Sequence, residues 1–339
     1  MKWAYVCTKN ATDISYTQEP QFEQVINTQI AQLWESRHEG KLRAKDGTKL
    51  YWCKLTHESH TKALVVVNGR IESAWKYQEL FFDFYQQGYN IYSFDHRGQG
   101  LSTHLAPNPE MGHINEFDDY LDDMQLLLES FDLSHYEQRH LLAHSMGGNI
   151  STRYLQTRPN HGFDKIALSA PMYGVNVPWY LKPIAIWLSQ IMTAIYPTPT
   201  YAPGYQGYVA KPFDINPLSS SKVRYHWFRD LYEKMPELKI GGPSTRWVWQ
   251  GLMAAKQCIQ QTRQVNIPLL VVQAGADQIV SNQDQLRFIN KLSGTNANAA
   301  LVTVDGAKHE VLFEKDQYRN QALDAITTFF GDNTFFTDK

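Results

Sequence analysis

The sequence predicts an α/β fold with a mostly parallel sheet, helices on both faces and an inserted, largely helical cap. Short apolar runs alternate with helical patterns along most of the chain. Repeated alternation of this kind is typical of parallel sheets covered by helices. A proline- and aromatic-rich stretch interrupts it after residue 171, and this interruption predicts the insertion. A chain of 339 residues is long enough for one large domain carrying such an insertion.

Residues 1–45 are expected to form an N-terminal helical extension. Pro20 suits the first turn of a helix. Apolar residues then follow at helical spacing: Phe22, Val25, Ile26, Ile30, Leu33 and Trp34. The pattern predicts a helix packed on the main domain, and contact with a membrane is the alternative.

The main domain is expected to span residues 46–171 and 245–332. Its strands are predicted at residues 48–55, 63–68, 90–95, 141–143, 165–169, 268–273 and 300–305. Its helices are predicted at residues 75–87, 117–131, 146–158, 245–261, 283–292 and 316–330. The solid apolar run at residues 64–67 is typical of a strand buried on both faces. Ligands of such sheets lie at the carboxyl ends of the strands.

Residues 172–244 are expected to form the cap. Six apolar residues follow helical spacing: Ile184, Trp187, Leu188, Ile191, Met192 and Ile195. Such a face can cover an acyl pocket, enter a membrane interface or simply form the core of the cap. Trp187, Ile191 and Met172 are the candidate substrate-binding residues. Residues 172–246 carry eight Lys and Arg against four Asp and Glu, a basic balance that suits an anionic substrate or surface unless it is random scatter.

Ser145 is the candidate nucleophile. An apolar strand pattern runs directly into Ala143-His-Ser-Met-Gly147, and a helical pattern follows. Strand, sharp turn and helix are the context of a nucleophile elbow, whose usual form is Gly-x-Ser-x-Gly. Small residues are needed on both sides of the serine because the backbone folds tightly around it. Alanine at the first position departs mildly from the pattern, and an ordinary serine in a turn is the alternative.

A serine hydroxyl needs a base within hydrogen-bond reach and a third group that orients the base. In folds with this elbow the chain order is serine, acid, histidine. His309 is the only histidine after residue 226, so it is the candidate base. Asp277 follows a buried strand and is the candidate acid. Asp305 and Glu310 compete for that role, but both are close to His309 in sequence.

The oxyanion of an acyl-transfer intermediate needs two N–H donors. The backbone N–H of Met146, the residue after the nucleophile, is one candidate. The loop after the strand at residues 63–68 supplies the other, the backbone N–H of Arg70. Gly69 is expected to permit unusual backbone angles there, and a plain turn is the alternative.

Composition excludes several other classes of protein. A net charge of −2 without a basic block argues against nucleic-acid binding. The three cysteines, Cys7, Cys53 and Cys258, are far apart, so they predict neither a disulfide framework nor a metal site. No histidine, cysteine or carboxylate spacing indicates a metal, and no cofactor motif is present. Without a signal peptide or spanning segment, a cytoplasmic location is expected.

Several motifs resemble the α/β-hydrolase superfamily, in its monoacylglycerol-lipase and lysophospholipase branch. They are residues 94–102 (FDHRGQGLS), 143–148 (AHSMGG), 169–172 (SAPM) and 275–280 (GADQIV). Three further stretches, together with the elbow alanine, resemble the bacterial lysophospholipase L2 family. They are residues 68–73 (NGRIES), 241–244 (GGPS) and 309–316 (HEVLFEKD). In this resemblance Ser145, Asp277 and His309 fall on the triad positions of the family.

The resemblance implies a serine esterase that cleaves the remaining acyl ester of lysophospholipids. It also implies peripheral attachment to the inner face of the bacterial inner membrane. A monoacylglycerol lipase or general carboxylesterase would keep the chemistry and change the substrate. A non-catalytic binding module on a hydrolase fold is the alternative from another class of protein.

Overall fold

A computed structural model describes residues 15–176, 182–195 and 198–331. Within these residues the chain forms an eight-stranded sheet in the order β1-β2-β4-β3-β5-β6-β7-β8. The strands are β1 (His38–Arg43), β2 (Lys49–Leu55), β3 (Lys62–Val67), β4 (Tyr89–Phe94), β5 (Gln138–His144), β6 (Lys165–Ser169), β7 (Leu269–Ala274) and β8 (Ala299–Val304). Only the pairs β1/β2 and β2/β4 are antiparallel among the described strands. The predicted mostly parallel sheet is confirmed.

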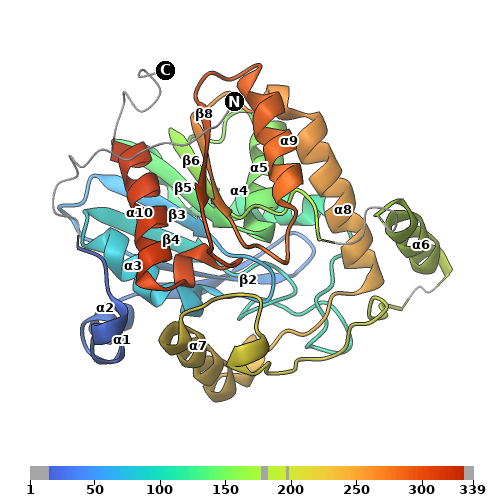
Figure 1. Cartoon of the computed structure of the whole chain (residues 1–339), viewed down its shortest axis with the longest axis horizontal. Coiled ribbons are helices and arrows are strands. Elements are labelled where there is room, and N and C mark those ends of the chain that lie inside the picture. Colours follow the sequence, from blue (N-terminus) through green and yellow to red (C-terminus); the bar gives the residue numbers. More distant parts are fainter. Residues whose placement is uncertain (1–14, 177–181, 196–197, 332–339) are drawn as a thin grey trace.

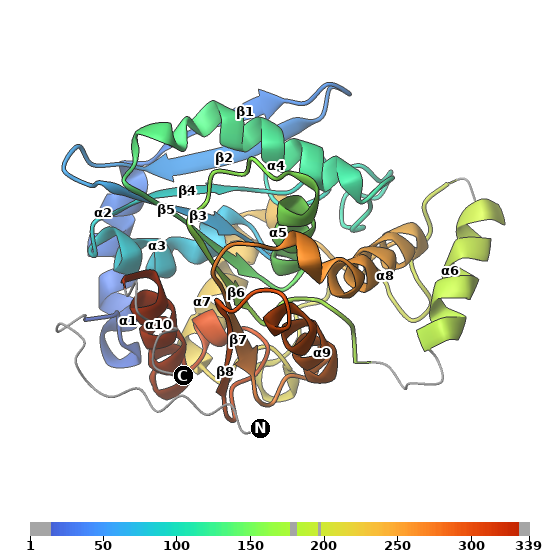
Figure 2. The ribbon, with the colours of Figure 1, turned by 90° about the horizontal axis from the view of Figure 1, so that it is seen from above.

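Helices cover both faces of the sheet. They are α1 (Glu19–Ile26), α2 (Gln29–Glu35), α3 (Gln78–Tyr85), α4 (Asp118–Phe131), α5 (Met146–Thr157), α6 (Lys182–Ile195), α7 (Lys222–Lys234), α8 (Thr245–Gln260), α9 (Asn282–Ser293) and α10 (Asp316–Gly331). Figure 2 shows α3 and α10 on one face and α4, α5, α8 and α9 on the other. This arrangement buries the central strands on both sides, so every residue of β4 and β7 is buried.

Two features of the N-terminal region differ from the sequence prediction. β1 lies inside residues 1–45 and pairs with β2, so the sheet begins at His38 and the helical extension ends before it. β1 is an exposed edge strand with mostly polar residues, and it therefore lacks the apolar run that marks buried strands. The predicted helix is two helices, because the chain breaks at Asn27 and Thr28. Residues 1–14 of the extension lie outside the described part of the chain.

The insertion after β6 contains α6, α7 and two short 3-10 turns, joined by long irregular segments. Its two helices lie apart (Figure 1). α6 packs along α8, whereas α7 lies near the carboxyl ends of the strands and contacts α1. Tyr232 of α7 donates a hydrogen bond to the Ile71 carbonyl, 2.8 Å away. The two helices of the insertion therefore have different neighbours, and α7 reaches the loop after β3.

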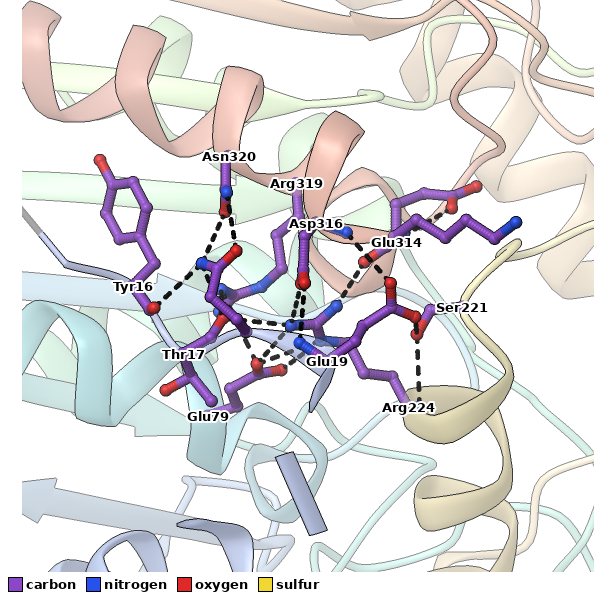
Figure 3. Close-up of polar contacts among 12 residues, drawn as sticks. Tyr16, Thr17, Glu19, Glu79, Ser221, Arg224, Glu314, Asp316, Arg319 and Asn320 are labelled. Carbon is purple, nitrogen blue, oxygen red and sulfur yellow. Dashed lines mark hydrogen bonds and ion pairs between the residues drawn. The ribbon is translucent and has the colours of Figure 1, made fainter. Parts of the chain in front are cut away.

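A buried polar network ties α7 to the N-terminal segment, α3 and α10 (Figure 3). Arg224 of α7 forms ion pairs of 2.8 Å with Glu79 and 2.9 Å with Asp316. Arg319 of α10 forms a 2.6 Å ion pair with Asp83, whose other oxygen accepts hydrogen bonds from the backbone and side chain of Thr17. Four segments that are distant in sequence thus share one charged cluster.

Candidate active site

Ser145 occupies a sharp turn between β5 and α5. Its backbone angles are φ 51° and ψ −115°, a left-handed conformation that costs free energy in a residue with a side chain. The turn is held by neighbours: the Ser145 N–H donates to Ser169, and the Ser145 carbonyl accepts from Met172, each at 3.0 Å. Ala143 is fully buried in β5, so its small side chain fits the first position of the motif. The strand, strained turn and helix have the geometry of a nucleophile elbow.

Gly147 is required by close packing of α5 against β3. A Cβ atom at this position would lie 2.5 Å from the backbone carbonyl oxygens of Val67 and Asn68. Backbone atoms of a buried strand cannot move aside easily. Gly147 therefore lets the start of α5 approach the end of β3, and this approach brings the turn at Ser145 close to the loop after β3.

We expect Gly147→Ala to lower kcat by about 10²-fold, because a displacement of about 1 Å in the site costs on that order. Helix propensity alone would favour alanine by roughly 1 kcal/mol, so propensity cannot explain a loss. Steady-state hydrolysis of a chromogenic short-chain ester measures the effect. Gly331→Ala is the matched control, since no atom of the described residues lies within 4 Å of its added Cβ. A Gly147→Ala enzyme with normal kcat would contradict the packing account.

The structure brings the three candidate catalytic side chains into one hydrogen-bonded chain. His309 Nε2 lies 2.9 Å from Ser145 Oγ, and His309 Nδ1 lies 2.7 Å from Asp277 Oδ2. Each residue follows the carboxyl end of a different strand: β5, β7 and β8. His309 is thus within proton-transfer distance of Ser145, and the Asp277 carboxylate is placed where it can orient the imidazole.

Asp277 is held in its ionised form. Burial opposes ionisation, but hydrogen bonds from His309 and from the backbone N–H groups of Ile279 and Val280 outweigh it, so the Asp277 pKa is lowered. The neighbouring His144 ring lies 4.9 Å from the His309 ring. Burial lowers the pKa of His144 to about 4, which leaves it neutral at neutral pH. His144 therefore adds no positive charge that would oppose protonation of His309.

The two candidate oxyanion donors belong to the start of α5 and to the loop after β3. Met146 is the first residue of α5, so its N–H has no partner within the helix. The Arg70 N–H donates no hydrogen bond within the described residues. Gly69 is not in a left-handed conformation, contrary to the sequence prediction; the positive φ of this loop, 61°, belongs to Ile71. Gly69 is needed for space, because a Cβ there would lie 3.2 Å from the Ser145 Cβ.

A buried charged cluster holds this loop, and sequence analysis missed it. Glu72 accepts hydrogen bonds from the Gly69 N–H at 2.6 Å and from Lys76 at 2.8 Å. Lys76 also forms a 2.6 Å ion pair with Glu310, the residue after His309. Burial opposes ionisation of Glu72, but the Lys76 charge outweighs it and lowers the Glu72 pKa. The cluster therefore joins the loop after β3 to the loop that carries His309.

The candidate substrate-binding residues are in different places. Met172 is buried beside Ser145, to which it is hydrogen bonded. Trp187 and Ile191 lie on α6, which both views place beyond α8 from the sheet. Trp187 is 63% exposed. The structure does not bring these two residues to Ser145, because α6 packs along α8 rather than over the strand ends.

A cavity of about 300 Å³ lies between α6, the start of α8 and residues 105–115. Its lining includes His113, Met192 and Arg246, but none of the three candidate catalytic side chains. In the part of the chain that the structure describes, no cluster of three or more histidine, cysteine or acidic residues could hold a metal ion. No helix within the described ranges has the length and apolar character needed to span a bilayer.

Comparison with known proteins identifies the family. Residues 58–316 match the family model described as "Serine aminopeptidase, S33". Lysophospholipase L2 of Escherichia coli is 33% identical over 322 residues, which cover 93% of each chain. A probable lysophospholipase L2 of Haemophilus influenzae is 35% identical, over 92% of this chain and 97% of the relative. The chain belongs to the lysophospholipase L2 family of α/β-hydrolases. The predicted superfamily and the prediction of a hydrolase enzyme are confirmed at the level of this family.

Solved structures support the α/β-hydrolase fold. A soluble variant of monoglyceride lipase from Saccharomyces cerevisiae, solved with a substrate analogue, superposes with a TM-score of 0.68. It covers 87% of this lysophospholipase L2 family member and 94% of the yeast chain, at 17% identity. The Paleococcus ferrophilus monoacylglycerol lipase gives a TM-score of 0.63 at 18% identity, over 83% and 98% of the two chains. At this level of identity the similarity concerns the fold alone.

Proposed function

We propose that this chain is a serine esterase that hydrolyses the acyl ester of lysophospholipids, releasing a fatty acid and a glycerophospho-alcohol. The observation that carries the proposal is the hydrogen-bonded chain Ser145–His309–Asp277 at the carboxyl edge of the sheet. The names of the two bacterial relatives support the choice of substrate.

The proposed reaction begins when Ser145 Oγ attacks the acyl carbonyl carbon while His309 Nε2 accepts the hydroxyl proton. The Asp277 carboxylate stabilises the resulting imidazolium and keeps its ring in place. The carbonyl oxygen becomes an oxyanion, and the N–H groups of Met146 and Arg70 donate hydrogen bonds to it. Neutral His144 next to His309 does not oppose this protonation.

Collapse of the intermediate breaks the ester bond, and His309 returns its proton to the leaving glycerol oxygen. The acyl group stays on Ser145 as an ester. A water molecule, deprotonated by His309, then attacks this acyl-enzyme and releases the fatty acid. A lipid hydroxyl in place of water would instead give acyl transfer. No cofactor enters these steps.

Residues 172–244 are proposed as the cap of the enzyme, between the core segments 46–171 and 245–332. Several of the apolar side chains exposed on this insertion are large: Trp187, Ile195, Tyr205, Val209 and Ile215. We infer peripheral contact of this surface with the inner face of the bacterial inner membrane, from the cytoplasmic side. Co-sedimentation of the protein with anionic phospholipid vesicles measures this contact, and its absence would refute the inference.

Two alternatives to this proposal can be tested, one by the substrate preference and the other by covalent labelling of the active serine. The monoglyceride lipases among the solved structures suggest a monoacylglycerol lipase or general carboxylesterase with the same triad. A non-catalytic binding module would keep the fold without turnover. The geometry of Ser145 and His309 favours an enzyme over the binding module, since a binding module has no need of a strained serine within reach of a base.

The deciding experiment compares fatty-acid release by the purified protein from three lipids with the same acyl chain. They are lysophosphatidylethanolamine, lysophosphatidylcholine and monoacylglycerol. We expect a higher kcat/KM for both lysophospholipids than for monoacylglycerol. Equal or faster monoacylglycerol hydrolysis would reject the proposed substrate class and leave the triad in place.

A further inference from the structure

Arg70, in the loop next to the candidate nucleophile, carries a positive charge that has no carboxylate partner among the described residues. Its Nη1 donates one hydrogen bond, 2.9 Å long, to the Gly241 carbonyl. Its guanidinium lies 5.4 Å from the centre of the Trp247 ring. No acidic side chain among the described residues forms an ion pair with it, and no acceptor is recorded for its Nε or Nη2. Most donors of this guanidinium are therefore available to a ligand.

The surroundings of Arg70 make this charge costly. Burial lowers the Arg70 pKa, because the charged form is desolvated. The buried guanidinium groups of Arg224 and Arg319, by contrast, each pair with a carboxylate in the network of Figure 3. An uncompensated, partly buried cation destabilises a fold unless something else satisfies it. Groups of this kind concentrate at functional sites.

The backbone at Arg70 lies close to Ser145, and the Arg70 side chain extends from there toward Gly241 and Trp247. The preceding residue, Gly69, is packed so closely against the nucleophile that its added Cβ would be 3.2 Å from the Ser145 Cβ. Trp247, next to the guanidinium, converges with Met172 on Gly251: both side chains lie 3.5–3.6 Å from a Cβ built there. Met172 in turn is hydrogen bonded to Ser145. Trp247 therefore packs near both the Arg70 guanidinium and Met172, the residue whose backbone N–H donates to Ser145.

We propose that the Arg70 side chain binds the phosphate of the substrate headgroup. The proposal rests on the proposed function and deepens it by naming the residue that selects a phosphate-bearing lipid. A guanidinium matches the geometry of phosphate oxygens and binds them through paired, charge-assisted hydrogen bonds. In a lysophospholipid the phosphate is only a few bonds from the acyl ester. Arg70 can therefore bind two groups of one substrate molecule. Its backbone N–H donates to the oxyanion formed from the acyl ester, and its side chain donates to the phosphate.

The cap is a weaker source of this selectivity than its composition suggested. Arg224 is paired with Glu79 and Asp316, Lys239 with Glu233, and Arg246 with Glu116. The partners of Arg224 and Arg246 lie outside residues 172–246, so these pairs offset part of the basic surplus of that segment. Arg70 belongs to the core, lies beside the nucleophile and has no such partner, so it is the better candidate for recognising the headgroup.

The test measures kcat/KM for lysophosphatidylethanolamine and for monoacylglycerol with the same short acyl chain, both below their aggregation concentrations. We expect Arg70→Met to lower the ratio of the two values by about 10- to 100-fold, the usual effect of losing a charge-assisted hydrogen bond. Arg70→Lys, which keeps the charge without the paired donors, should give an intermediate ratio. Lys211→Met removes an exposed charge from the insertion and should leave the ratio unchanged. Thermal melting of each variant verifies that it is folded.

The outcomes separate this proposal from the proposed function. A wild-type enzyme that does not prefer the lysophospholipid would reject the proposed substrate class itself. A wild-type preference that survives in Arg70→Met would overturn the role of Arg70 alone. Equal losses on both lipids would mean that Arg70 only supports the oxyanion loop, which also overturns it. Inorganic phosphate is also tested as an inhibitor of monoacylglycerol hydrolysis. If Arg70→Met abolishes this inhibition but leaves the ratio of the two kcat/KM values unchanged, Arg70 binds free phosphate and not the headgroup, which overturns the proposal.

Discussion

Replacing Ser145 by alanine is expected to lower kcat by about 10⁴- to 10⁶-fold, the loss typical of removing a triad nucleophile. The reason is geometric: Ser145 Oγ is the atom that His309 Nε2 reaches at 2.9 Å, so the variant has no group that could form the acyl-enzyme. Fatty-acid release under single-turnover conditions measures the loss. Labelling by a fluorophosphonate probe should disappear in the same variant, because the probe reacts with the activated hydroxyl.

Ser151→Ala is the matched control for this experiment. Ser151 lies in α5, the helix that follows Ser145, is fully buried and has a hydroxyl with no hydrogen-bond partner among the described residues. Its removal should leave both turnover and labelling intact. Labelling that persists in Ser145→Ala would identify another nucleophile. Absence of labelling in the wild-type protein would favour the binding module over the enzyme.

The sequence predicts those strands of the sheet whose burial produces a continuous run of apolar residues. β3 and β7 are buried on both faces, and each reads as a continuous apolar run. β1 has no such run, because it is an exposed edge strand whose partner, β2, lies on one side only. The break between α1 and α2 was missed for a related reason. Apolar residues continue at helical spacing across Asn27 and Thr28, and no proline or glycine marks the interruption.

The proximity of Ser145, Asp277 and His309 could be predicted because each residue follows a strand in the chain order typical of the elbow. The supporting residues could not. Glu72, Lys76 and Glu310 come together through side-chain packing between separate loops, and nothing in their local sequence indicates a buried charged cluster. The same holds for Trp187 and Ile191. Their helical spacing predicts an apolar face, but it does not say which neighbour that face will meet.

The charged network of Figure 3 is also an arrangement that the local sequence does not indicate, and it is expected to contribute strongly to the stability of the fold. Arg224→Met is expected to lower the free energy of unfolding by about 3–5 kcal/mol, the usual effect of removing one partner from a buried ion pair. The variant leaves Glu79 buried and deprived of its 2.8 Å ion pair, while Asp316 and the Glu314 carbonyl also lose a donor. Urea denaturation followed by tryptophan fluorescence measures the change.

Lys222→Met, an exposed position on the same helix, is the control and should change the free energy of unfolding by less than about 0.5 kcal/mol. The double variant Glu79→Leu/Arg224→Met removes both charges of the pair. It should be less destabilised than the sum of the single variants, because the Glu79 carboxylate is no longer left buried without Arg224. A loss below about 1 kcal/mol in Arg224→Met would mean that the pair is dispensable. Tyr232 of α7 donates a hydrogen bond to Ile71 in the loop after β3, which carries a proposed oxyanion donor. A loosened α7 should therefore lower kcat even under conditions where the variant remains folded.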